Sequence, residues 1–161
     1  MENNAVDYNR LLDDLRQQET DLQFTHFTND DAYTLGQLVI ELARQDGLAI
    51  TVDIIRHGQQ LFHAARPGTS SDNDEWIKRK VRTVNRFGHS SFYMGIHYKR
   101  QNTTMAEKAL LDPAEFAAHG GSFPIIIRNV GMVGTLTVSG LPQEEDHKLV
   151  VRAIRKFLEE N

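Results

Sequence analysis

The side chains able to do chemistry in this chain are histidines, carboxylates, lysines and hydroxyl groups, because the sequence contains no cysteine. That absence excludes disulfides, thiolate nucleophiles, iron–sulfur ligation and cysteine-ligated zinc. Seven histidines are present, and neutral imidazole is a common ligand for metals near physiological pH. No two of them have the i, i+4 spacing of a helical zinc site. We therefore expect no tightly bound metal ion.

His119 is the most informative histidine, because it precedes the pair Gly120 and Gly121. Glycines without side chains let a ligand approach the backbone, and free N–H groups there can hold an anion. We interpret the three residues as a candidate ligand-binding segment. The alternative is a helix C-cap whose histidine interacts favourably with the helix dipole.

A second candidate is a run of cationic side chains around Trp76. Lys78, Arg79 and Arg82 are spaced three or four residues apart, which gathers positive charge on one side of a helix. A phosphate, a carboxylate or a haem propionate could dock there. The alternative is a solvated helix face that pairs with nearby acidic residues or with a neighbouring subunit.

Asp53 is the only catalytic candidate. It falls on the same side of an expected strand as Thr51 and Ile55, so its carboxylate could have partly apolar neighbours, a raised pKa and the role of a general base. The alternative is a hydrated aspartate on a solvent-facing side of the sheet. Phosphate-binding glycine loops and the Gly-x-Ser-x-Gly elbow of hydrolases are absent from the sequence.

The elements that must position these residues follow from hydrophobic periodicity and turn signals. Helices are expected over residues 6–18, 29–47, 71–88, 90–99 and 143–158. Hairpin strands are expected over residues 48–55 with 60–64 and over 125–128 with 133–138. Residues 101–123 have weak periodicity, with a short helical turn at Asp112-Pro113, and are the expected place for a mobile loop. Strands that come in pairs favour an α+β fold with an antiparallel sheet.

The composition limits the class of protein. A length of 161 residues and an apolar content of 40% predict a single domain over residues 1–161. The net charge of -4 gives no sequence-wide attraction to nucleic acid or to anionic lipid. The start Met1–Asn4 lacks the pattern of a signal peptide, and no apolar stretch could span a bilayer, so we expect a cytoplasmic protein.

Three stretches carry a family resemblance: Phe87–Ser91, His119–Pro124 and Gly134–His147. Over residues 30 to 158 the chain resembles uncharacterised protein family 0303, UPF0303, within the GlcG-like and HbpS-like haem-degrading-domain superfamily. The resemblance implies a profilin-like α+β fold, with a five-stranded antiparallel sheet flanked by helices, and a symmetric homo-oligomer. In the superfamily's Lys-Ala-x-Thr pattern, Lys80 and Thr83 match and Val81 does not. We therefore expect the protein to have no cofactor, and haem is the alternative ligand.

The two expected helices on either side of Gly88 carry more large apolar side chains than a single helix face packed on the sheet requires. We expect them to supply an interface between copies of the chain, and the candidates are Trp76, Phe92, Tyr93 and Met94. The alternative is that they complete the core of one protomer beside residues 101–123.

The leading hypothesis is a homo-oligomeric protein that binds an unknown small molecule near Gly120-Gly121 and the basic helix. A small anion is one candidate for that molecule. One rival hypothesis is an enzyme or haem-handling protein that uses histidine or Asp53. Another is an oligomeric scaffold for a different protein.

Overall fold

A four-stranded antiparallel sheet in the order β2-β1-β4-β3 forms the centre of the computed structural model, which describes residues 5–161. Met1–Asn4, from which we inferred that a signal peptide is absent, lie outside the described residues. The strands are β1 (Thr51–Arg56), β2 (Gln59–Ala65), β3 (Ser122–Ile127) and β4 (Gly131–Ser139). Both expected hairpins are confirmed, and β1 pairs antiparallel with β4 between them.

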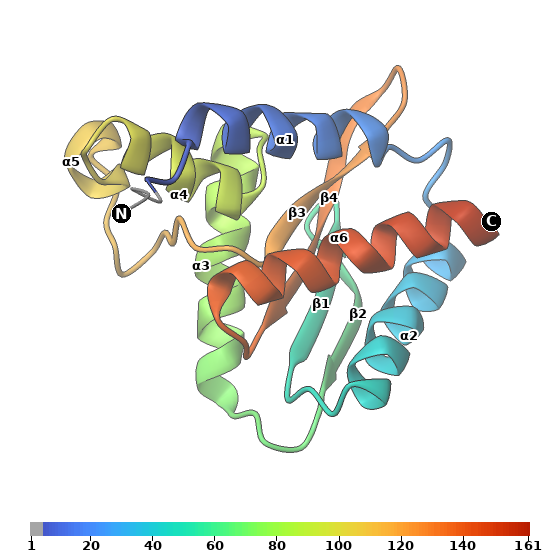
Figure 1. The fold of residues 1–161 in the computed structure, drawn as a ribbon. Coiled ribbons are helices and arrows are strands. Elements are labelled where there is room, and N and C mark those ends of the chain that lie inside the picture. The colour runs from blue at the N-terminus through green and yellow to red at the C-terminus, as the bar shows by residue number, and fades with distance from the viewer. Residues whose placement is uncertain (1–4) are drawn as a thin grey trace.

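Six helices surround the sheet in the described chain (Figure 1). They are α1 (Tyr8–Asp21), α2 (Asn29–Gln45), α3 (Ser71–Phe87), α4 (Ser91–Arg100), α5 (Met105–Ala109) and α6 (Gln143–Glu160). The short helix α5 was not expected from the sequence. None of the helices within residues 5–161 has the length and apolar character needed to cross a membrane.

Residues 5–161 do not form the fifth strand that the resemblance implies. Phe24 makes a single parallel bridge to Ile127 at the β3 edge, donating its N–H to the Ile126 carbonyl at 2.8 Å. The Phe24 ring is 1% exposed and packs on Phe27, with ring centroids 5.0 Å apart. The chain then enters α2 at Asn29. The segment between α1 and α2 therefore pairs with the sheet only at Phe24, where it anchors an aromatic side chain in the core.

The two faces of the sheet differ in polarity because side chains alternate along each strand. The apolar face packs against α2 and α6 and forms the main core. Its buried strand residues include Val52, Ile54, Phe123, Ile125, Leu136 and Val138. The opposite face carries buried polar residues: Thr51, Asp53, Ser122, Thr135, Thr137 and Ser139. Helix α3 packs on this polar face, mainly over β4 and β3.

A second core lies between α1 and α4, beside α5 at one end of the molecule (Figure 1). Leu12 and Leu15 of α1 pack there against Phe92 and Tyr93 of α4. Glu19 adds a polar anchor, because its buried carboxylate accepts the Ser90 N–H at 2.7 Å. An acceptor at the start of α4 satisfies a free N–H of that helix end.

Candidate functional site

The segment that follows α5 folds back onto α3. Arg79 donates from Nε and Nη2 to the Pro113 carbonyl, at 3.1 and 2.7 Å. Arg82 donates to the Glu115 carbonyl at 3.2 Å, and the Ala117 N–H donates to the Arg79 carbonyl at 3.1 Å. Arginine side chains that we assigned to ligand binding therefore also hold this segment against α3. It forms one wall of a cavity.

This first cavity has a volume of about 360 Å³ and lies between α3, α4, α5 and the segment 111–119. Its lining has an apolar group of residues, which we call the floor, and a polar group, which we call the rim. The apolar lining residues include Tyr98, Met105, Leu111, Phe116 and Ala117, and the rim carries Arg79, Lys99, His119 and Gln143. Such a lining suits a ligand that has both an apolar body and negative charge.

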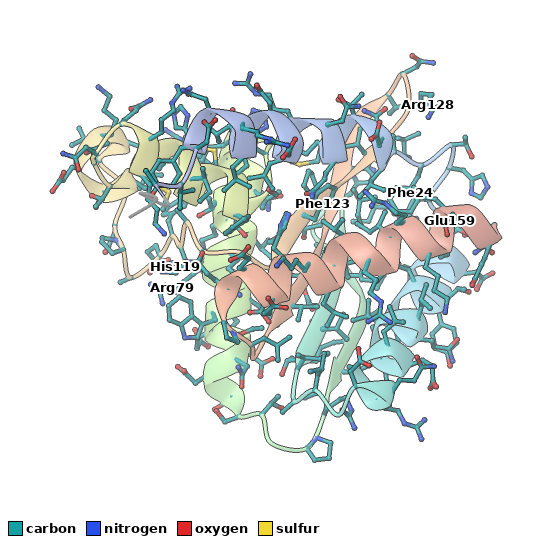
Figure 2. All side chains as sticks on the ribbon, viewed as in Figure 1. Phe24, Arg79, His119, Phe123, Arg128 and Glu159 are labelled. Carbon is teal, nitrogen blue, oxygen red and sulfur yellow. The ribbon has the colours of Figure 1, made fainter. Side chains whose placement is uncertain are left out.

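His119 lies beside Arg79 (Figure 2), and both residues line this cavity. Its ring contacts Trp76 edge to face, with centroids 5.3 Å apart, and the Arg79 guanidinium lies 4.3 Å from the centroid of the same indole. Partial burial lowers the pKa of His119, and the positive charges of Lys80, Arg79 and Lys99 lower it further. The imidazole is therefore neutral near pH 7, the form that can bind a metal or accept a proton.

A second cavity of about 280 Å³ shares His119 and Gln143 with the first. Its lining is mostly polar and also includes Asp72, Asn73, Trp76, Lys80, Ser139, Gly140, Leu141 and Asp146. Lys80 is 3% exposed, and its Nζ lies 3.1 Å from Asp146 Oδ2 and 3.1 Å from the Val138 carbonyl oxygen. The two cavities therefore flank His119, one apolar and one containing a buried ion pair.

Gly120 and Gly121 are buried and line neither cavity. A Cβ on Gly120 would collide with the Gln143 carbonyl oxygen, and one on Gly121 would lie 2.7 Å from Lys80 Nζ. The Gly120 N–H donates to Gln143 Oε1 at 2.9 Å. The expectation that a ligand approaches this backbone is therefore corrected, because the glycines are required for close packing against α6, β4 and Lys80.

Neither Lys78 nor Arg82 lines the cavities that contain His119, so the expected single basic face is divided. Both line a third cavity of about 540 Å³ beside β1 and β2, together with Asp53. Lys78 pairs with Glu75 at 2.8 Å. Of these four candidates, Arg79 and His119 line the first cavity, whereas Lys78 and Arg82 line the third.

Asp53 is buried and has partners, so it is not a hydrated surface aspartate. Its Oδ1 accepts a hydrogen bond from Gln60 Nε2 at 2.6 Å and lies 3.1 Å from His63 Nδ1. His63 Nε2 lies 3.1 Å from Asp74 Oδ1, a close contact without hydrogen-bond geometry. An imidazole thus bridges two carboxylates. Sequence analysis missed His63 and Asp74, although the hairpin register places Asp53 opposite His63.

The apolar residues assigned to an interface are divided between interior and surface. Phe92, Tyr93 and Met94 are between 3% and 7% exposed, because α1 covers them within the protomer. They leave almost no surface for a second copy, which corrects that part of the expectation. Trp76 is half-buried and lines the second cavity. Across residues 5–161, no three histidine or acidic side chains converge as ligands of one metal ion.

Comparison with known proteins adds a family and a fold. The profile of the family described as haem degrading protein HbpS-like matches residues 27–155. A UPF0303 protein of Streptomyces coelicolor is 53% identical over 147 residues, which cover 91% of this chain and 93% of the relative. The crystal structure of the Ybr137w protein has a TM-score of 0.86 and 38% identity, covering 92% of this chain and 88% of that chain. The crystal structure of a PduOC:Heme complex has a TM-score of 0.67 at 20% identity, covering 80% of this chain and 93% of that chain.

Proposed function

The chain belongs to the UPF0303 proteins of the HbpS-like haem-degrading family, and we propose that it is a ligand-binding protein whose first cavity takes up a flat apolar molecule carrying carboxylates. One observation carries this proposal: the cavity combines an apolar floor with a rim of Arg79, Lys99 and a neutral His119. The floor would remove the ligand's apolar surface from water, and the cations would face its negative groups.

Haem is the ligand of this class that we propose first. The solved PduOC neighbour is a complex with haem, and the apolar, cationic and imidazole side chains that line the first cavity suit such a group. His119 would supply an imidazole to the iron, and Lys99 and Arg79 would face the propionates. Bound haem would supply a redox-active iron centre. The protein's own contribution is a neutral imidazole, positive charge and an apolar wall.

A smaller anion is the competing occupant of the same cavity. The rim charges would serve it equally well, whereas the apolar floor formed by residues such as Met105 and Phe116 would have no partner. Removing apolar surface from water is favourable by about 25 cal/mol per Å², so the apolar floor favours the larger, flatter ligand. The apolar floor is therefore the feature that distinguishes the two ligands.

A hemin titration of the purified protein, followed by absorbance, tests the proposal. We expect saturation near one haem per chain and a sharp Soret band, because an imidazole would bind the iron. His119→Ala should change the band and weaken binding about tenfold, which corresponds to ~1.4 kcal/mol. Lys99→Glu should weaken binding and leave the band shape unchanged, because it alters only the charge facing the propionates.

The matched control is His57→Asn in the β1–β2 turn. His57 is exposed and has a left-handed backbone with φ of 50°, which asparagine tolerates. This variant should bind hemin as the wild type does. Absorbance that rises without saturation, or equal spectra for the His119→Ala and wild-type proteins, would contradict the assignment of haem to this cavity.

A further inference from the structure

Lys80 is a buried amine that the proposed haem site does not use. Its side chain is 4% exposed, yet the residue lines the second cavity. The ammonium group has three donors, and two of them are directed at Asp146 Oδ2 and the Val138 carbonyl. Gly121 leaves room for Nζ, because any Cβ there would lie 2.7 Å from it.

The partner carboxylate is held in place independently of Lys80. Asp146 Oδ1 accepts the Leu141 N–H at 3.0 Å, while Oδ2 faces Lys80. Burial lowers the pKa of Lys80 and raises the pKa of Asp146, and each charge partly opposes the change in the other. Both directions favour transfer of the ammonium proton to the carboxylate, which would leave a neutral amine beside a carboxylic acid.

We propose that Lys80 forms an imine with a short, uncharged, polar aldehyde or ketone bound in the second cavity. The cavity volume of about 280 Å³ suits a small molecule, and its polar lining offers Asn73, Ser139 and Gln143 for hydroxyl groups. Asp72 and Asp146 disfavour a carboxylate on the ligand. The inference concerns the second cavity and requires no ligand in the first.

The reaction is balanced without an added oxidant or reductant. Lys80 first passes a proton to Asp146, and the free Nζ electron pair forms a C–N bond to the carbonyl carbon. One proton then moves from the positively charged Nζ to the negatively charged carbonyl oxygen, which gives the hydroxyl group of a neutral carbinolamine. Asp146 then returns its proton to that hydroxyl, water leaves, and a protonated imine remains beside the Asp146 carboxylate.

Reductive trapping on the wild-type protein tests this inference. Limiting glycolaldehyde and then sodium borohydride are added at neutral pH, and labelled residues are located by peptide mass spectrometry. We expect one hydroxyethyl group per chain, on Lys80. Exposed lysines have a pKa of about 10.4 and are almost fully protonated at that pH, so they should react slowly. Label spread over exposed lysines such as Lys78 and Lys148, with Lys80 unmodified, would overturn the proposal.

Variants separate a reactive lysine from a structural ion pair. Lys80→Met should abolish the single adduct, whereas Lys78→Met, two residues away on the exposed side of α3, should retain it. Asp146→Asn should retain Lys80 and slow its labelling at least tenfold, because no carboxyl group remains to protonate the hydroxyl group that leaves as water. Circular dichroism verifies folding of each variant. If Lys80 of the wild type reacts only after unfolding in urea, the ion pair is structural and the inference is wrong.

Discussion

At the scale of single residues, His147 shows how burial sets a protonation state. It is 3% exposed, and its ring lies between Phe92 and Phe123, with centroid distances of 4.9 and 6.1 Å. Its Nε2 lies 2.8 Å from Gln18 Oε1 of α1, and Nδ1 has no partner. Burial lowers the pKa of His147 to about 4, with a smaller contribution from Lys148.

The lowered pKa predicts a loss of stability in acid. The unfolded chain binds the proton near pH 6.5, whereas the folded protein binds it only near pH 4, so stability is complete above pH 6.5 and falls as the pH drops toward 4. The difference corresponds to about 3 kcal/mol. Urea unfolding of wild type and His147→Gln, between pH 7 and pH 4, measures it. The variant should lack this part of the pH dependence, and parallel curves for the two proteins would exclude His147 as the cause.

Not every residue-level feature could be predicted from the sequence. The cationic spacing around Trp76 correctly placed side chains on α3, but helical periodicity alone does not show which cavity each side chain lines. Arg79 and Lys78 are adjacent in sequence and line different cavities. The sequence alone suggested that Gly120 and Gly121 contact a ligand. A pair of glycines looks the same in a sequence whether a ligand or another part of the chain fills the space left by the missing side chains.

At the scale of elements, local patterns were sufficient for most helices and strands. The alternation in β1 and β4 predicted their common sheet, because each has one apolar side. Helix α5 was missed, since its five residues hold one buried apolar group, Met105, and give no period. Likewise, the role of Phe92 depends on α1, which lies 71 or more residues earlier in the chain. Contacts between such distant segments leave no local periodic signal.

The β1–β2 hairpin is connected to α3 through charged groups, and we propose Asp53 as the residue that positions His63. Asp53→Asn preserves the shape of the side chain but removes the charge that faces Gln60 and His63. The free energy of unfolding should fall by about 2 kcal/mol, because hydrogen bonds to a buried charged group are lost. Chemical denaturation gives this value, and the ring nitrogen shifts of His63 in NMR should change with it.

Asp72→Asn is the control for that variant, since Asp72 is an exposed aspartate in the first turn of α3. It should alter the free energy of unfolding by less than about 0.5 kcal/mol. Equal stability of Asp53→Asn and wild type, with unchanged His63 nitrogen shifts, would show that Asp53 does not orient the imidazole.

At the scale of the whole molecule, α1 lies outside the residues that the HbpS-like family profile matches. The family match covers residues 27–155, and α1 ends at Asp21. This helix covers the apolar side of α4 and brings Gln18 to His147 and Glu19 to Ser90. Side chains that would otherwise form an exposed apolar surface are therefore part of this protomer's interior. A homo-oligomer must use a different surface.

The edge strand β2 and the half-buried Trp76 are two surfaces that could serve self-association. Strand β2 lies at one edge of the sheet and contains neither lysine nor proline, the residues that commonly protect an edge from pairing with another chain. Light scattering at micromolar concentration should therefore give a mass above that of the 18.3 kDa monomer. Ala65→Lys places a charge on the exposed part of this strand and should lower the mass, whereas Lys108→Ala on α5 should leave it unchanged. A monomeric wild type would exclude the oligomer. An oligomer insensitive to Ala65→Lys but reduced by Trp76→Ala would place the interface at the start of α3, next to the cavities that flank His119.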